Sequence, residues 1–130
     1  MNPAAIEAMS SALAIIGNPS SLHADGRAVR KYVEDARDVL AKHIGCVASE
    51  IIFTGSGTEA NNIAIKGIYW QRNKDKARPV VITSAIEHQA VLEPAQWLAE
   101  HQGAQHITIP VTEDGLISLD ALRLLIDEHG

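Results

Sequence analysis

Residues 51–60 carry the run IIFTGSGTEA, and this short stretch decides the fold that the sequence predicts. Its first three residues are β-prone, and they stop abruptly at the glycine-rich turn of residues 55–57. From Thr58 to about Gln71 the apolar residues recur at helical spacing over a wide face. A short apolar run, a tight turn and a helix follow one another where a strand of a parallel sheet passes into its covering helix.

The chain beyond this stretch repeats the alternation. Residues 80–83 (VVIT) predict a second strand, residues 88–101 a helix that ends before Gly103, and residues 106–109 a third strand. A turn at residues 113–115 and an N-cap at Ser118 predict a last helix. The order β-α-β-α-β-α over residues 50–130 requires a parallel sheet with covering helices, so we expect an α/β fold.

The chain before this stretch is predicted to be helical. Asn2 is placed to cap, and Pro3 to begin, an amphipathic helix that ends at Gly17. An ordered loop over residues 17–21 (GNPSS) and a long helix over residues 24–44, ended by Gly45, follow. Residues 1–49 are therefore a helical lead-in, and the length of 130 residues fits one domain.

Composition excludes several classes of protein. Hydrophobic residues make up 46% of the chain and charged residues 21%, which is typical of a globular domain. The net charge of −5 argues against nucleic acid as a partner. No apolar run approaches the ~18–20 residues that span a membrane, and the first residues lack the basic and apolar segments of a secretory leader.

Cysteine and histidine usage points to a reducing compartment without a metal site. Cys46 is the only cysteine, so no internal disulfide forms, and a cytoplasmic location is expected. We interpret Cys46 as a packing residue. The six histidines show no ligand spacing of the HExxH kind, so no metal is expected.

The glycine-rich turn is a candidate anion site. A glycine-rich turn between a strand and the start of a helix exposes free backbone N–H groups. The hydroxyls of Ser56 and Thr58 add donors, so a phosphate group fits there. The alternative is a strand-to-helix turn in which the glycines only allow the backbone geometry and no ligand binds. Gly55-x-Gly57-x-x-Ala60 also matches a dinucleotide fingerprint, but no acidic residue ends the second strand as that fingerprint requires.

His88 is the second candidate. It lies just beyond the predicted strand of residues 80–83, where an imidazole ring can stack on a flat cofactor or move protons. For an isolated histidine, a capping or surface role is the favoured interpretation.

Three segments together resemble one family. Residues 17–23 (GNPSSLH), 53–62 (FTGSGTEANN) and 82–91 (ITSAIEHQAV) look like cysteine desulfurases of the nitrogen-fixation and iron-sulfur-assembly type. These belong to the class V aminotransferase branch of the fold-type I enzymes that use pyridoxal 5′-phosphate (PLP). The resemblance implies that the chain is an N-terminal part of the large PLP-binding domain, a single partial domain over residues 1–130.

The resemblance also implies site roles and an activity. Gly57 and Thr58, with Ser56 beside them, would hold the cofactor phosphate, and His88 would stack on the pyridine ring and shuttle protons. The reaction would remove sulfur from L-cysteine, giving alanine and an enzyme persulfide whose sulfur passes to an acceptor or scaffold protein. Asn18 and His23 match a loop near the active site of such enzymes, without an assigned contact.

The chain departs from the family in ways that limit this activity. It has no Ser-x-His-Lys segment, so the lysine that holds the cofactor is missing, and Cys46 does not match the persulfide cysteine. We therefore expect a fragment that is inactive alone and that associates as a homodimer or with a complementing chain. A Rossmann-like nucleotide-binding domain and a catalytically dead interaction module are the alternatives.

Overall fold

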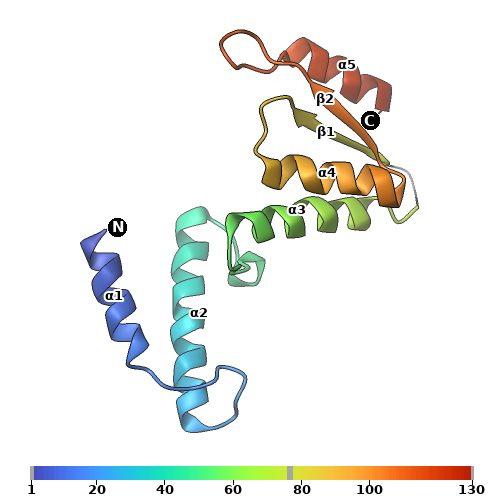
Figure 1. Cartoon of the computed structure of the whole chain (residues 1–130). Helices are drawn as coiled ribbons and strands as arrows, with labels where there is room; N and C mark the ends of the chain where they lie inside the picture. Colours follow the sequence, from blue (N-terminus) through green and yellow to red (C-terminus); the bar gives the residue numbers. More distant parts are fainter. Residues whose placement is uncertain (1, 76–77, 130) are drawn as a thin grey trace. The chain divides into compact units, whose positions relative to one another are not determined.

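The chain folds as two compact units, Met1–Phe53 and Thr54–Gly130. The computed structural model describes residues 2–75 and 78–129, and Figure 1 labels their helices and strands. Within these residues no helix combines the length and the apolar character that crossing a membrane requires.

Helix α1 (Pro3–Leu13) opens the first unit and begins as the sequence predicts. The Asn2 side chain caps it by accepting a hydrogen bond from the amide of Ala4 at 3.0 Å. The helix ends at Leu13 rather than at Gly17. Ile15 and Ile16 are β-branched and disfavour a helix, and the Gly-Asn-Pro run behind them cannot continue one.

Helix α2 (Ala24–Ile44) has the predicted bounds. Gly45 ends it in the left-handed region, with φ 81°, and its amide donates to the carbonyl of Ala41 at 2.9 Å. At the other end of the helix the loop of residues 18–21 lies directly on Gly26. A Cβ atom there would lie 2.5 Å from the carbonyl oxygen of Asn18, so only glycine allows this contact.

The predicted strand over residues 51–53 is wrong. After the short 3₁₀ helix η1 (Ala48–Glu50), the backbone of Ile51 is extended, with φ −90° and ψ 121°, but among the described residues no strand pairs with it. A strand is stabilised by its ladder to a neighbour, so β-propensity alone does not make one. The described order from residue 54 onward is therefore α-β-α-β-α, and the sheet has two strands instead of the predicted three.

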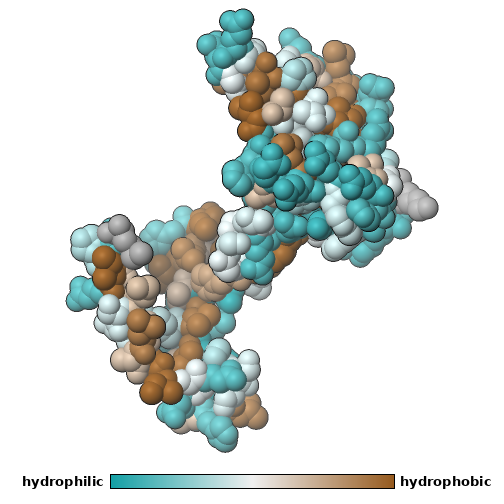
Figure 2. Space-filling model, viewed as in Figure 1, coloured by the Kyte–Doolittle hydropathy of each residue, from teal (hydrophilic) through white to brown (hydrophobic). Residues whose placement is uncertain are grey.

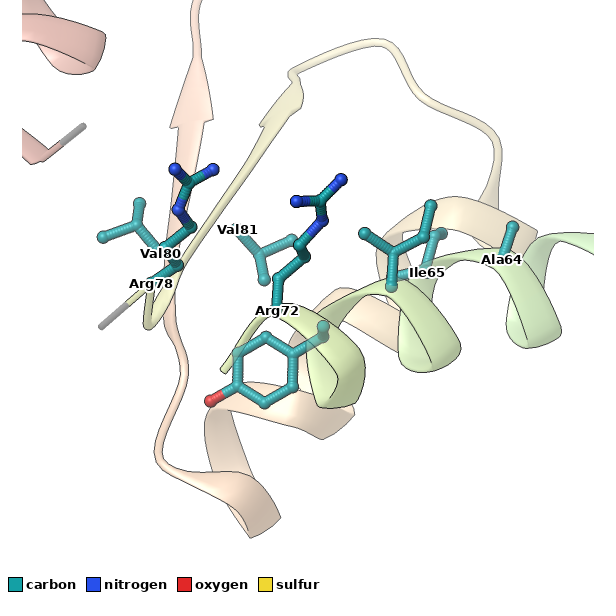
Figure 3. A pocket seen from close by; sticks show the side chains of 8 residues that line it. Ala64, Ile65, Arg72, Arg78, Val80 and Val81 are labelled. Carbon is teal, nitrogen blue, oxygen red and sulfur yellow. The ribbon is translucent and has the colours of Figure 1, made fainter. Parts of the chain in front are cut away.

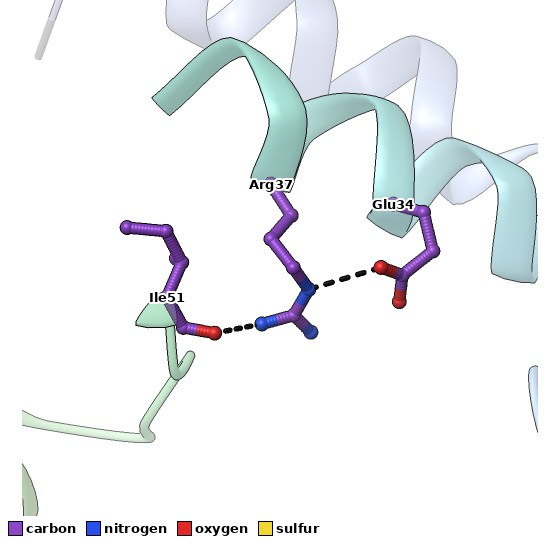
Figure 4. A network of polar contacts seen from close by, with 3 residues as sticks. All are labelled: Glu34, Arg37 and Ile51. Carbon is purple, nitrogen blue, oxygen red and sulfur yellow. Dashed lines mark hydrogen bonds and ion pairs between the residues drawn. The ribbon is translucent and has the colours of Figure 1, made fainter. Parts of the chain in front are cut away.

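Arg37 of α2 holds this extended segment in place. Its guanidinium donates to the carbonyl of Ile51, and its Nε atom pairs with the Glu34 carboxylate at 3.1 Å (Figure 4). The same guanidinium carbon lies 4.9 Å from the centre of the Phe53 ring. This one side chain thus makes two contacts with a segment that has no ladder to a neighbouring strand.

The second unit is built on a parallel pair of strands. Strand β1 (Val80–Ser84) pairs with β2 (Gln105–Ile109) in a register that runs from Val80 opposite Gln105 to Ser84 opposite Ile109. Helix α4 (Gln89–Gln102) connects them as the crossover. The predicted α/β class and the parallel direction of these strands are confirmed.

The core of this unit lies on one face of the sheet. Helix α3 (Gly57–Arg72) packs against α4, and Tyr69, Leu98 and Ala104 form a buried cluster against which Val81 of β1 packs. Leu98 is fully buried. The sheet thus holds α4, and through it α3, in a fixed position.

Helix α5 (Leu119–His129) lies on the side of the sheet opposite α4 (Figure 1). Leu125 and Ile126 line a cavity of about 230 Å³ together with Val80 and Ile82, whose side chains point away from the core cluster. The predicted Ser118 cap is confirmed, because its Oγ atom accepts from the amide of Ala121 at 3.2 Å.

Apolar side chains remain on the surface of both helices of the first unit (Figure 2). Leu13 in α1 is 77% exposed and Ile44 in α2 is 69% exposed, and Ile16 between the two helices is 87% exposed. Isolated exposed apolar residues are common, but a continuous set of them marks a surface that another surface covers.

Candidate functional site

Helices α3 and α4 run side by side in the same direction. The ammonium of Lys66 lies 4.3 Å from the centre of the Trp97 ring, and one turn later the hydroxyl of Tyr69 donates to the carbonyl of Gln102 at 3.3 Å. Contacts thus advance along both helices together, so the first residues of α3 and of α4 lie at one end of the pair (Figure 1). This end is the carboxyl end of β1, where α/β proteins bind ligands.

The turn before α3 leaves three successive amides open. Ser56 caps the helix, and its Oγ atom accepts from the amide of Glu59 at 3.1 Å. Among the described residues, no hydrogen bond acceptor faces the amides of Ser56, Gly57 or Thr58. A Cβ atom on Gly57 would meet nothing within 4 Å, so the surface over these amides is open.

The Glu59 carboxylate shapes this turn, a role that the sequence analysis missed. It reaches back to accept a hydrogen bond from the amide of Gly55 at 2.7 Å. A Cβ atom on Gly55 would lie 3.2 Å from the same carboxylate oxygen, so glycine favours this close approach. The Ser-x-x-Glu spacing of a capping box signals that Glu59 reaches back toward the turn, but the amide that it meets is that of Gly55 rather than the N-cap amide of Ser56.

His88 is the N-cap of α4. Its Nδ1 atom accepts a hydrogen bond from the amide of Ala90 at 3.0 Å, and its side chain is exposed. The favoured interpretation of an isolated histidine, a capping role, is therefore what the structure shows. Capping fixes the ring at the first turn of α4 and leaves its other nitrogen free for a ligand.

The loop between β1 and α4 is tied down at both ends. The amide of Ala85 donates to the carbonyl of Ile109 at 2.9 Å, and the Ser84 hydroxyl donates to the Glu87 carboxylate at 3.2 Å. His88 follows directly after Glu87, the last residue that these contacts hold. The backbone is therefore held to the end of β2 three residues before His88.

The two helix starts together fit a phosphate-bearing ligand. Open amides at the first turn of a helix attract an anion through the helix dipole as well as through hydrogen bonds. The hydroxyl of Thr58 adds a further donor, and the exposed ring of His88 offers a flat surface at the neighbouring helix start. Within residues 2–75 and 78–129, no group of three or more His, Cys, Asp or Glu side chains is placed to hold a metal ion.

Asn18, His23 and Cys46 all lie in the first unit and have local roles there. The Asn18 side chain accepts from the amide of Ser20 at 2.9 Å, and His23 precedes α2 without capping it through its side chain. Cys46 is a free cysteine and is partly buried. The packing role inferred from the sequence stays a prediction.

An apolar cavity of about 350 Å³ lies apart from these helix starts, between α3 and β1. Figure 3 shows Ala64 and Ile65 of α3 on one side of it and Val80 and Val81 of the strand on the other. Strand β1 has a hydrogen-bonded neighbour on only one side among the described residues. The cavity therefore runs along an unpaired strand edge.

The chain belongs to the class V aminotransferase family, whose model matches residues 1–129. Enzymes of this family depend on PLP, and the α/β architecture is that of fold-type I. The chain is 46% identical to an IscS-like cysteine desulfurase of Mycobacterium tuberculosis, over 99% of its own length and 33% of that protein. The expected family and fold are thus confirmed.

Solved structures agree with this assignment. A NifS-like protein superposes with a TM-score of 0.78 at 35% identity, covering 87% of this chain and 30% of that one. DndA from Streptomyces lividans superposes with a TM-score of 0.81 at 34% identity, covering 95% and 34%. The chain spans about a third of the length of the relatives it matches.

Proposed function

We propose that this chain is the cofactor-phosphate-binding part of a PLP-dependent cysteine desulfurase. The observation that carries the proposal is the placement of two helix starts at one end of the α3–α4 pair, one with three open amides and the other with His88 as its cap. The cysteine desulfurase relatives described above give the reaction class.

The α3 turn would hold the phosphate of PLP. The amides of Gly57 and Thr58, with the hydroxyls of Ser56 and Thr58, supply donors, and the helix dipole favours the negative charge. The Glu59 carboxylate stays on the amide of Gly55 at 2.7 Å and so leaves the open amides to the phosphate. These donors would orient the cofactor.

His88 would lie against the flat ring of the cofactor. Its cap to Ala90 holds the imidazole in one orientation, which lowers the entropy lost when a ligand stacks on it. Bound PLP supplies an electron sink that allows bonds around the α-carbon of an amino acid to break. His88 would shield that centre from water and hold a proton at its free nitrogen.

The substrate of the complete enzyme would be L-cysteine, with alanine and a protein-bound persulfide as products. Sulfur would then pass to an acceptor or scaffold protein, as in iron-sulfur cluster assembly. The 130 residues contain no Ser-x-His-Lys segment, so the direct test of this chain is cofactor binding rather than turnover.

The chain would act in association with a homodimer partner or a complementing chain in the cytoplasm. Support for a covering partner comes from the unpaired edge of β1, the apolar cavity beside it, and the exposed side chains of α1 and α2. Unpaired strand edges and continuous apolar surface are features that proteins cover.

Titration of the chain with PLP, followed by absorbance and by thermal unfolding, tests the proposal. At 100 times Kd the cofactor should stabilise the fold by about 2.7 kcal/mol. Thr58→Ala and His88→Ala should each weaken binding by about tenfold, whereas Thr58→Ser and His43→Ala serve as matched controls that retain it. Unchanged affinity in both Thr58→Ala and His88→Ala would show that the site is placed wrongly.

Two other results would favour the alternatives. Tighter binding of a nicotinamide dinucleotide than of PLP would indicate a Rossmann-like nucleotide-binding domain. No thermal shift with either ligand would indicate an interaction module without a cofactor.

A further inference from the structure

Three histidines bind helix ends through the same ring nitrogen but with opposite partners. At the start of α4, Nδ1 of His88 meets the amide N–H of Ala90 at 3.0 Å. In the last turns of α2 and α4, Nδ1 of His43 meets the carbonyl of Val39 at 2.7 Å, and Nδ1 of His101 meets the carbonyl of Trp97 at 3.1 Å.

The partners dictate where each neutral ring carries its proton. An amide N–H can only donate, so Nδ1 of His88 must present a lone pair, which leaves the proton on Nε2. A carbonyl can only accept, so Nδ1 of His43 and of His101 must carry the proton. An amide donor at a helix start and a backbone carbonyl in the last turns of a helix thus select opposite tautomers.

The outward nitrogen of His88 is free to act. Its side chain is exposed, and Nε2 has no hydrogen bond partner among residues 2–75 and 78–129. The nearest acid in the sequence, Glu87, accepts instead from the Ser84 hydroxyl at 3.2 Å. The group that His88 offers is therefore an N–H donor.

We propose that the Ala90 amide is a positioning group that holds His88 in the Nε2–H tautomer, so that His88 meets the bound ligand as a hydrogen bond donor. This role rests on the proposed function, since the ligand is the PLP that the neighbouring turn would hold. The acceptor would be an oxygen of the ligand. A proton on Nδ1 breaks the cap to Ala90, so that nitrogen takes no part in proton movement while the cap is intact.

Nitrogen NMR of the chain without cofactor tests the tautomer. Two-bond ¹H–¹⁵N spectra are recorded at a pH where imidazole rings are neutral, and His→Gln variants assign the signals. His88 should show an unprotonated Nδ1 and a protonated Nε2, whereas His43 and His101 should show the reverse. A protonated Nδ1 in His88, or a mixture of its two forms, overturns the proposal.

Two methylated forms of the His88 ring then test the capping nitrogen and the donor nitrogen separately. His88→Nε2-methylhistidine keeps the acceptor at Nδ1, so the thermal midpoint should stay while Kd for PLP rises about tenfold. His88→Nδ1-methylhistidine should instead lower the midpoint by several degrees. If the Nε2-methyl variant binds PLP as tightly as the unmodified chain, the donor role is wrong.

The His88 tautomer is tested by NMR of the free chain, whereas the proposed function is tested by PLP binding. A chain that shows the expected tautomer but binds no PLP overturns the proposed function and the ligand-facing role with it. The tautomer itself is decided by the spectra of the free chain.

Discussion

The phenol of Tyr69 and the backbone carbonyl of Gln102 join the last turns of α3 and α4, with 3.3 Å between their oxygens. The side-chain amide of Asn73 donates to the same phenol at 2.9 Å, so this hydroxyl links two helices and the segment that leaves α3. Because the helices are parallel, this contact and that of Lys66 with Trp97 together set how far one helix is shifted along the other. The alignment of the candidate site is therefore set partly at the far end of the unit.

Tyr69→Phe should destabilise the second unit by about 1 kcal/mol, because it removes two part-buried hydrogen bonds, those with the Gln102 carbonyl and the Asn73 side-chain amide. Urea unfolding followed by circular dichroism measures this change. Trp70→Phe is the control, since Trp70 is 49% exposed and its hydrogen bond to the Gln102 side chain is also exposed. An equal loss in both variants would contradict the role given to Tyr69.

Ser56→Ala should cost about 1 kcal/mol of stability, because it removes the N-cap of α3. Ser56→Asp keeps a capping oxygen and should restore that stability, but its negative charge repels a phosphate at the neighbouring amides. We therefore expect Ser56→Asp to fold like the unmodified chain and to bind PLP at least tenfold more weakly. Thermal unfolding with and without PLP gives both values, and tight binding by Ser56→Asp would argue against an anion at this turn.

His88→Asn should separate capping from cofactor contact. Asparagine is a good N-cap, so the variant should match the unmodified chain in thermal midpoint, whereas His88→Ala should lose about 1 kcal/mol. Neither variant retains the ring, so both should lose affinity for PLP equally. Tight PLP binding by His88→Asn would mean that the ring does not contact the cofactor.

Gly45→Ala and Gly67→Ala should change stability in opposite directions. Gly45 has φ 81°, where a Cβ atom is unfavourable, so alanine should destabilise α2 by about 1 kcal/mol. Gly67 lies within α3, and a Cβ atom there would meet nothing within 4 Å, so alanine should stabilise that helix by up to about 1 kcal/mol. Chemical unfolding of both variants checks the sign.

Sequence patterns predicted the elements whose signals are local. Helix α2 begins and ends where its apolar stripe and Gly45 place it, and the caps at Asn2 and Ser118 form as expected. Caps and helical periodicity involve residues within one turn of each other, so a sequence contains the whole signal. Strands β1 and β2 were predicted from their short apolar runs, and they form because each is the hydrogen-bonded partner of the other.

The prediction of a strand at residues 51–53 was wrong because β-propensity does not show whether a neighbouring strand is present to pair with it. Its β-propensity is real, and Ile51 is extended, but Arg37 supplies contacts that no propensity scale includes. The features of the candidate site also differ in whether their signal in the sequence is local. The open turn and the cap at His88 follow from local spacing, whereas the alignment of the two helix starts depends on Lys66, Trp97, Tyr69 and Gln102, which come together only in the fold.

The contact at Gly26 links the identity of this one residue to the path of the loop of residues 18–21. Its backbone has ordinary helical angles, so a saturation library would reject other side chains there for lack of room rather than for strain. The excluded volume belongs to the carbonyl of Asn18 and the side chain of Ser21. A relative with a larger residue at the equivalent position must therefore carry the preceding loop on a different path, and the identity of that one residue is enough to recognise the difference.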